Sequence, residues 1–195
     1  MTDGPDPADG SPDFRFLGED VRFRGWRISL TEARFRAPDG SVFTRDIVRH
    51  PGAVAVVPVT DGGDVLLVRQ YRGAVDRHLL EIPAGTRDVE GEPPAETARR
   101  ELLEEVGVDA RHMRFLATMF NSPGFCDEET YLYLATGLDP GATARHGVEE
   151  EHMEVESVPL TDVDRLVAAG ELIDGQTILG LLLARHVLAE EPDGH

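Results

Sequence analysis

The pattern of apolar and polar positions predicts that the first half of the chain is built mainly of strands. Apolar residues alternate with polar ones over residues 20–48, where Pro38-Asp39-Gly40 marks a tight turn between two strands. Residues 53–59 form a continuous apolar run, which is typical of a buried strand. The turn signal Asp61-Gly62-Gly63 predicts a hairpin to the next strand. Further strands are expected at residues 64–71, 79–82, 114–120, 130–136 and 153–158.

One helix is predicted to begin at Pro93 or Pro94 and to run to Val106. Proline suits a first helical turn, because the N–H that it lacks would have no partner there. Gly107 suits the C-terminal cap, because glycine adopts the left-handed conformation at no steric cost.

Two more helices are expected near the end of the chain. Thr161 and Asp164 match a capping box that opens a helix to Ala169, and residues 175–188 read as a long apolar helix. Because strands come first and helices are interleaved late, the order predicts a mixed α/β sandwich rather than a regular series of βαβ units.

Composition divides the chain into two structured parts with a tail at each end. Residues 1–13 are rich in Asp, Gly and Pro and are expected to be a disordered tail, as are residues 191–195. Residues 14–49 are expected to form a small N-terminal β subdomain, which needs another surface to cover it. Residues 50–190 are expected to form the main domain.

Charge and composition exclude several functions. The chain has 195 residues, with 37 acidic residues against 19 Lys plus Arg, and a net charge of −18. This balance disfavours binding to nucleic acids or to anionic membranes. Every basic residue is arginine, which excludes a Walker A lysine and a lysine Schiff base. Cys126 is the single cysteine, so an intrachain disulfide is excluded and a cytoplasmic location is expected.

Three carboxylates crowd the end of the first predicted helix. Glu101, Glu104 and Glu105 share one helical face at spacings i, i+3 and i+4. They repel one another, and they lie where the helix dipole favours cations. A Mg²⁺ ion would resolve this conflict, because it prefers carboxylate oxygens and keeps water ligands for a phosphate substrate. The alternative interpretation is a solvated acidic helix face.

The surrounding segment resembles the Nudix box. Its pattern runs through Gly85 and Glu92 to Arg100-Glu101-Leu102-Leu103-Glu104-Glu105-Val106-Gly107-Val108. The match is complete from Glu92 onward, whereas six residues instead of five separate Gly85 from Glu92. The insertion lies in the loop, so it leaves the register of the helix intact.

The resemblance implies the fold, the cofactor and part of the site. The expected fold is α/β, a Nudix α/β/α sandwich with a small N-terminal antiparallel β subdomain. The expected cofactor is Mg²⁺, with Mn²⁺ as a possible substitute. The resemblance implies cation ligands at the carbonyl of Ala84 and at Glu101, Glu104 and Glu105. Arg100 would orient the glutamates, and Glu92 would brace the box.

Motifs outside the box resemble the ADP-ribose pyrophosphatase branch of this family. They are Thr44-Arg45-Asp46-Ile47-Val48, Pro51-Gly52-Ala53, Gln70-Tyr71-Arg72, Glu81-Ile82-Pro83-Ala84-Gly85 and Ser122-Pro123-Gly124-Phe125-Cys126-Asp127-Glu128. The resemblance implies that Arg45 and Arg72 bind ADP-ribose and that Phe125 forms a wall of its site. It also implies a homodimer in which N-terminal strands help form the partner's site. An aromatic residue among Phe23, Trp26 and Phe35 is expected to stack on the adenine.

The same branch carries a catalytic carboxylate in a loop after the box. Here the candidates are Glu149, which fits best by register against the following strand, and then Glu151. Such a group would help to deprotonate the attacking water, and a loop could close over the substrate and reopen.

The expected function is therefore the Mg²⁺-dependent hydrolysis of ADP-ribose to AMP and ribose 5-phosphate by metal-activated water. Two alternatives stay open. The substrate could be another nucleotide-sugar or a dinucleotide, such as an ADP-sugar or GDP-mannose. The protein could also be a module that binds ADP-ribose without cleaving it, although such modules are expected to have a damaged set of glutamates.

Overall fold

The computed structural model describes residues 13–141 and 152–190. The chain divides into two compact units. The first comprises residues 1–50 and 122–127, and the second comprises residues 51–121 and 128–195. The segment 122–127 thus belongs with the N-terminal strands, although it follows the helix and its box in the sequence.

The first unit contains a three-stranded antiparallel sheet in the order β1-β2-β3. Its strands are β1 (Arg15–Arg24), β2 (Ser29–Arg36) and β3 (Val42–Arg49). The predicted turn joins β2 to β3, where the Gly40 N–H donates to the Ala37 carbonyl oxygen at 2.9 Å. The rings of Phe35 and Phe43 stack with their centroids 5.5 Å apart.

The second unit contains two sheets with the strand orders β10-β5-β6 and β7-β4-β9-β8. These strands are β4 (Ala53–Pro58), β5 (Asp64–Arg72), β6 (Arg77–Glu81), β7 (Ala84–Thr86), β8 (Val108–Phe120), β9 (Glu129–Pro140) and β10 (Glu154–Pro159). β4 and β9 run parallel, whereas the other strand pairs of these sheets are antiparallel. The expected strands are present, and β8 and β9 extend beyond their predicted ends.

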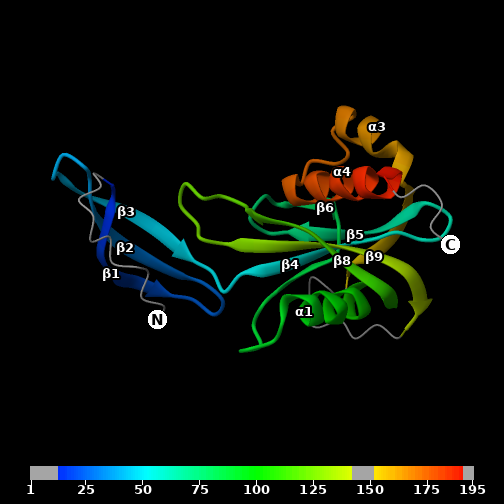
Figure 1. Ribbon diagram of the computed structural model, residues 1–195, viewed down its shortest axis with the longest axis horizontal. Coiled ribbons are helices and arrows are strands. Elements are labelled where there is room, and N and C mark those ends of the chain that lie inside the picture. The colour runs from blue at the N-terminus through cyan, green and yellow to red at the C-terminus, as the bar shows by residue number, and fades with distance from the viewer. Residues whose placement is uncertain (1–12, 142–151, 191–195) are drawn as a thin grey trace. The chain divides into compact units, whose positions relative to one another are not determined.

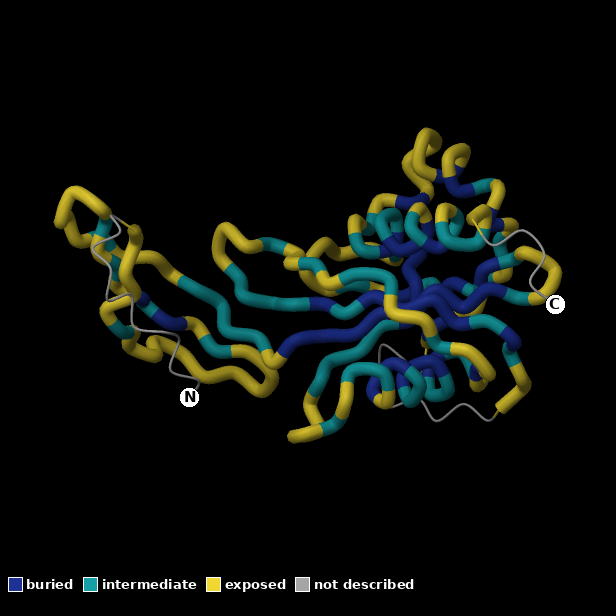
Figure 2. The backbone as a smooth tube through the Cα atoms, viewed as in Figure 1, coloured by how far each residue is buried: buried dark blue, intermediate teal, exposed yellow. Residues whose placement is uncertain are grey.

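Strand β4 is buried along its whole length and separates two apolar cores (Figure 2). Ala55 and Val57 face the core that α4 (Gly175–Glu190) covers, whereas Val54 and Val56 face the core beneath α1 (Pro94–Glu101). Side chains of a strand point alternately to opposite faces, so one apolar run supplies both cores. Figure 1 shows the helices on opposite sides of these strands, which is the predicted α/β/α sandwich.

The segment around Asp61-Gly62-Gly63 turns as predicted, but the antiparallel pairing that it closes is limited to a single bridge. The Gly63 N–H donates to the Thr60 carbonyl oxygen at 2.9 Å, and Val59 and Val65 form an isolated bridge. Beyond this bridge, β4 pairs with β7 and β9, whereas β5 pairs with β6 and β10. The turn therefore connects the two sheets of the second unit.

The helix that carries the three glutamates begins at Pro94 and ends at the predicted cap, but its last turn is not α-helical. Residues Leu102–Val106 form a π-helical turn, which has one more residue per hydrogen-bonded turn than an α-helix. Gly107 has a φ of 77°, and its N–H donates to the Leu103 carbonyl oxygen at 3.0 Å. The expected i, i+3, i+4 face is therefore modified at Glu104 and Glu105. Such π turns occur frequently at functional sites.

The capping box predicted at Thr161 is wrong. A short 3₁₀ segment (Leu160–Asp162) leads into α3 (Val163–Ala168), and no side chain caps the start of α3. Asp174 instead caps α4, because its carboxylate accepts hydrogen bonds from the N–H and hydroxyl of Thr177, both at 2.7 Å. None of the helices over residues 13–141 and 152–190 is long and apolar enough to span a membrane.

Thr177 joins the start of α4 to the strand segment that leads into β7. Its buried hydroxyl accepts a hydrogen bond from the Ile82 N–H at 3.0 Å. Thr177→Val should lower the free energy of unfolding by about 1–3 kcal/mol, because it leaves a buried N–H without a partner. Urea denaturation measures this loss. Thr177→Ser, which keeps the hydroxyl, is the matched control, and an equal loss in both variants would contradict the role of this hydrogen bond.

Candidate active site

Two buried glutamates lie against β7. The carboxylate of Glu105 accepts a hydrogen bond from the Ala84 N–H at 3.0 Å. A Cβ atom on Gly85 would lie 2.0 Å from Cδ of Glu101, so the carboxylate of Glu101 occupies the space that the glycine leaves. Glu101 is 9% exposed and Glu105 is 3% exposed. Three of the four predicted ligands, Ala84, Glu101 and Glu105, therefore lie at β7. The fourth, Glu104, shares Arg100 with Glu101.

Arg100 holds the acidic face together. Its guanidinium donates to Glu101 at 2.7 Å and to Glu104 at 3.3 Å, and it also lies within 3.5 Å of Asp88. Burial alone would lower the pKa of Arg100, but the neighbouring carboxylates, led by Glu101, raise it above its ordinary value. Arg100 is thus a cation that is hydrogen-bonded to both Glu101 and Glu104, and its role in orienting them for catalysis stays a prediction.

Glu92 braces the start of the helix. Its carboxylate accepts hydrogen bonds from the hydroxyl of buried Thr97 at 2.8 Å and from Arg100 at 3.4 Å. The bond from Thr97, followed by that from Arg100, lowers the pKa of Glu92. The loop between β7 and α1 is therefore pinned to the helix despite its additional residue.

A second arginine, Arg72, lies near Glu105. Arg72, at the end of β5, donates from Nε and Nη2 to the buried carboxylate of Glu81. Burial lowers the pKa of Arg72, but the hydrogen bond and charge of Glu81 and, after them, the charge of Glu105 raise it above its ordinary value. Arg72, predicted to bind substrate, thus lies near the predicted cation ligands.

The chemistry of these residues fits a divalent cation. Carboxylates are the preferred ligands of Mg²⁺, and the missing side chain at Gly85 lets the carboxylate of Glu101 lie against β7. Over residues 13–141 and 152–190, no three His, Cys, Asp or Glu side chains converge closely enough to bind a metal ion as they stand. Glu101 and Glu104 each accept a hydrogen bond from Arg100 through one carboxylate oxygen.

Gly85→Ala should damage the site more than the fold. The new Cβ would displace the carboxylate of Glu101, which is the flexible end of a side chain. We expect a loss of about 10²-fold in kcat/KM, since an error of about 1 Å in a reacting group costs that much. The melting temperature should stay near its original value.

Gly62→Ala is the matched control, because Gly62 has only an ordinary contact with Thr60. Steady-state assays and thermal unfolding measure both effects. Full activity of Gly85→Ala would show that the position of Glu101 is not critical.

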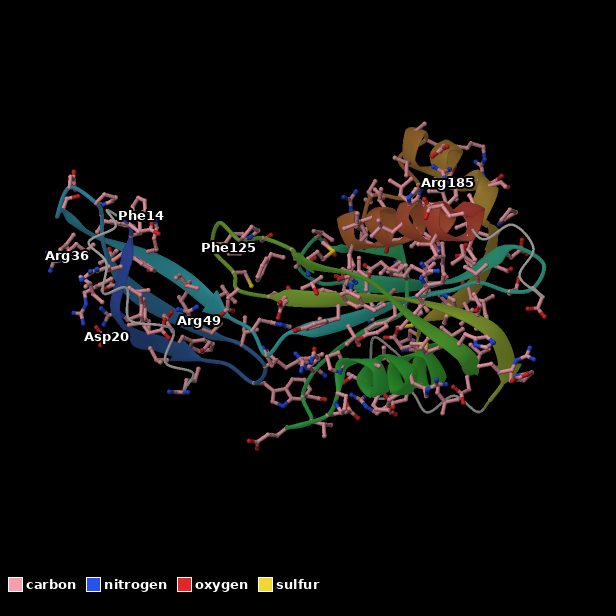
Figure 3. All side chains as sticks on the ribbon, in the orientation of Figure 1. Phe14, Asp20, Arg36, Arg49, Phe125 and Arg185 are labelled. Carbon is pink, nitrogen blue, oxygen red and sulfur yellow. The ribbon has the colours of Figure 1, made fainter. Side chains whose placement is uncertain are left out.

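Two predicted substrate residues belong to the first unit. The guanidinium of Arg45 lies 4.6 Å from the ring centroid of Phe43, and its Nη1 donates to the Thr44 carbonyl oxygen at 2.7 Å. Phe125 is 58% exposed and lies on the segment 122–127, where Figure 3 labels it. Neither residue belongs to the unit that contains Arg72 and the glutamates.

The segment that carries Phe125 is fixed to β3. The Val48 N–H donates to the Phe125 carbonyl oxygen at 2.8 Å, and the Asp127 N–H donates to the Val48 carbonyl oxygen at 3.2 Å. Asp127 also accepts hydrogen bonds from Arg49 at 3.0 Å and from the His50 N–H at 2.8 Å. The exposed ring of Phe125 is therefore presented from an ordered backbone.

The two candidate bases, Glu149 and Glu151, lie outside the described residues. Sequence reasoning assigned no role to Glu81 or Thr97, although both are buried polar residues of the site. Glu81 could have been noticed as an acidic residue at the end of an otherwise apolar strand. No comparable sequence signal marks Thr97.

Comparison with known proteins is consistent with this geometry. A NUDIX domain profile matches residues 49–178. The chain is 39% identical over 175 residues to an ADP-ribose pyrophosphatase of Mycobacterium tuberculosis, covering 90% of this chain and 84% of that protein. It is 41% identical over 161 residues to an ADP-ribose pyrophosphatase of Bacillus subtilis, covering 83% of this chain and 86% of that protein.

A solved structure has the same fold. The crystal structure of an ADP compounds hydrolase superposes with a TM-score of 0.79 at 23% identity, and the match covers 91% of this chain and 95% of that one. The profile match spans most of the chain, and the Nudix box forms the helix and loop that hold the buried glutamates. The chain therefore belongs to the Nudix family of hydrolases.

Proposed function

We propose that this protein hydrolyses the diphosphate of ADP-ribose to AMP and ribose 5-phosphate. The observation that carries the proposal is the pair of buried carboxylates, Glu101 and Glu105, held against Ala84 and Gly85. The two relatives named ADP-ribose pyrophosphatase, at 39% and 41% identity, support the choice of substrate.

The proposal includes Mg²⁺, or Mn²⁺ in its place, held by Glu101, Glu104, Glu105 and the carbonyl of Ala84. When bound, the cation supplies water activation and charge neutralisation at the diphosphate. Arg100 orients two of these glutamates, and the Ala84 N–H orients the third. Such bracing matters because ligands that are held in place lose less entropy on binding.

Arg72 and Arg45 are proposed to bind the anionic substrate, with Phe125 as a wall of its site. A guanidinium group can donate two parallel hydrogen bonds to a phosphate group. The excess of carboxylates around Arg72 and Arg100 would otherwise repel the substrate, so arginine contacts and a cation are both needed in a protein with a net charge of −18.

The general base is proposed to be Glu149, with Glu151 as the second candidate. This assignment comes from the sequence alone. The reaction needs a general base, because water attacks phosphorus efficiently only when a group accepts its proton.

A panel of nucleotide-sugars, assayed with Mg²⁺ in H₂¹⁸O, tests the proposed function. We expect ADP-ribose to have the highest kcat/KM and ¹⁸O to enter one phosphate product. Faster cleavage of GDP-mannose or another ADP-sugar would assign a different substrate. Binding of ADP-ribose without AMP formation would indicate a binding module.

We also propose that the protein is a homodimer in which the N-terminal sheet contacts the second copy. The first unit exposes several large apolar side chains, as expected for a sheet that a partner covers. They are Phe16, Val21, Phe23, Trp26 and Val42. Size-exclusion chromatography with light scattering should give twice the mass of the chain, and an active monomer would refute the proposal.

The proposed location is the cytoplasm, because a single cysteine is typical of reducing compartments. Cell fractionation tests it, and recovery of the protein outside the cytoplasmic fraction would refute it.

A further inference from the structure

Arg72 and Glu81 form a two-point contact between the neighbouring strands β5 and β6. Arg72 is the last residue of β5, and Glu81 is the last residue of β6. Nε of Arg72 lies 3.0 and 3.1 Å from the two carboxylate oxygens, and Nη2 lies 2.5 Å from Oε2. Both nitrogens on one edge of the guanidinium, Nε and Nη2, therefore donate to Glu81.

The two side chains differ sharply in exposure. The side chain of Glu81 is 5% exposed, whereas that of Arg72 is 42% exposed. Glu81 is thus too buried to contact a substrate itself. Nη1 of Arg72 makes no hydrogen bond to any residue that the structure describes, so the second edge of the guanidinium keeps its donors available.

The charges around Arg72 include that of a candidate cation ligand, Glu105. Burial alone would lower the pKa of Arg72, but Glu81 most strongly, and then Glu105 and Asp174, raise it. Glu105 is the glutamate that accepts the hydrogen bond from the Ala84 N–H. Arg72 is therefore bound to its buried anchor Glu81 and lies close enough to Glu105 to be influenced by its charge.

We propose that Glu81 is a positioning residue, which grips one edge of Arg72 so that the Nη1 edge is presented to the diphosphate of the substrate. This inference rests on the proposed function for its diphosphate substrate. A free arginine side chain loses much rotamer freedom when it binds a ligand, whereas an arginine already held by Glu81 loses less. Arginine suits this task because its planar fork can serve two partners at once, which a lysine ammonium cannot do in the same geometry.

The chain offers a matched control on the same strand. Arg69, also on β5, donates from Nε and Nη2 to Glu156 on β10. This pair has the same chemistry, but neither residue belongs to the candidate site. Glu81→Gln and Glu156→Gln therefore make the same chemical change to two similar ion pairs.

The experiment measures the Kd of ADP, a simple diphosphate probe, by titration calorimetry, together with KM and kcat for ADP-ribose. We expect Glu81→Gln to weaken ADP binding and raise KM by about 10-fold, with kcat within about twofold, because ground-state binding is lost. Glu156→Gln should leave all three values unchanged. Arg72→Lys should behave like Glu81→Gln, and it tests the proposal even if Glu81→Gln folds poorly.

A double-mutant cycle separates positioning from general stability. If Glu81 acts through Arg72, the double variant Glu81→Gln with Arg72→Ala should bind ADP no more weakly than Arg72→Ala alone. Additive effects, an unchanged Kd in Glu81→Gln or an unchanged Kd in Arg72→Lys would overturn the inference.

Failure of the proposed function gives a different result from failure of this inference. If the unchanged chain binds ADP in a Glu81-dependent way but does not cleave ADP-ribose, the proposed function fails and the positioning role stands. If it cleaves ADP-ribose while Glu81→Gln binds ADP normally, the positioning role fails. If it neither binds ADP nor cleaves ADP-ribose, both fail.

Discussion

Glu105→Gln is expected to slow ADP-ribose hydrolysis by about 10³-fold or more at limiting Mg²⁺. A bound cation contributes several kcal/mol to charge stabilisation, and about 1.4 kcal/mol corresponds to each factor of ten in rate. The glutamine amide oxygen can still accept the hydrogen bond from the Ala84 N–H. The substitution thus removes mainly the charge and leaves the local fold intact.

The measurement is a Mg²⁺ titration of kcat/KM for both proteins. The variant should need a much higher Mg²⁺ concentration and should not recover full activity. Glu96→Gln is the matched control, because Glu96 is an exposed glutamate in the first turn of the same helix. Normal activity of Glu105→Gln at the original Mg²⁺ concentration would refute its assignment as a ligand.

Glu149→Gln is expected to lower kcat by about 10²–10⁴-fold, which is the usual size of a general-base contribution. The KM for ADP-ribose should change much less, because a base acts on the attacking water rather than on substrate binding. The measurement is kcat as a function of pH, in which the variant should lose the acidic limb that reports the base.

The neighbouring acidic residues provide controls for this variant. Glu150→Gln and Glu151→Gln remove the same charge from the same segment. We expect normal kcat for Glu150→Gln and a small effect for Glu151→Gln. If Glu151→Gln shows the large loss of kcat, the base is Glu151. If neither Glu149→Gln nor Glu151→Gln lowers kcat strongly, neither of these two carboxylates accepts the proton.

The fold was largely predictable because its main signals are local. The apolar run at residues 53–59 predicts a buried strand, and β4 has both faces covered. Gly107 predicts the end of the helix because glycine adopts the left-handed conformation without steric cost, and it has a φ of 77° there. Long-range pairing decides to which sheet a strand belongs. The turn signal at Asp61-Gly62-Gly63 therefore could not show that β4 and β5 belong to different sheets.

The site was predictable only in part. The spacing of Glu101, Glu104 and Glu105 indicates a cation site, but an assumed α-helix gives no sign of the π turn over Leu102–Val106. The partner of Arg72 is equally hidden, because Glu81 lies on another strand and its register with β5 follows from sheet pairing. Pairings between segments depend on tertiary packing, and the pattern of a single sequence does not encode them directly.

We propose that the crowded glutamates bind a divalent cation beside the diphosphate of the substrate. Crystals soaked with Mn²⁺ and a non-hydrolysable analogue of ADP-ribose test it most directly. We expect anomalous density next to the carboxylates of Glu101 and Glu105 and the carbonyl of Ala84, in contact with the diphosphate of the analogue. Analogue bound in full occupancy with no anomalous density beside these groups would contradict it.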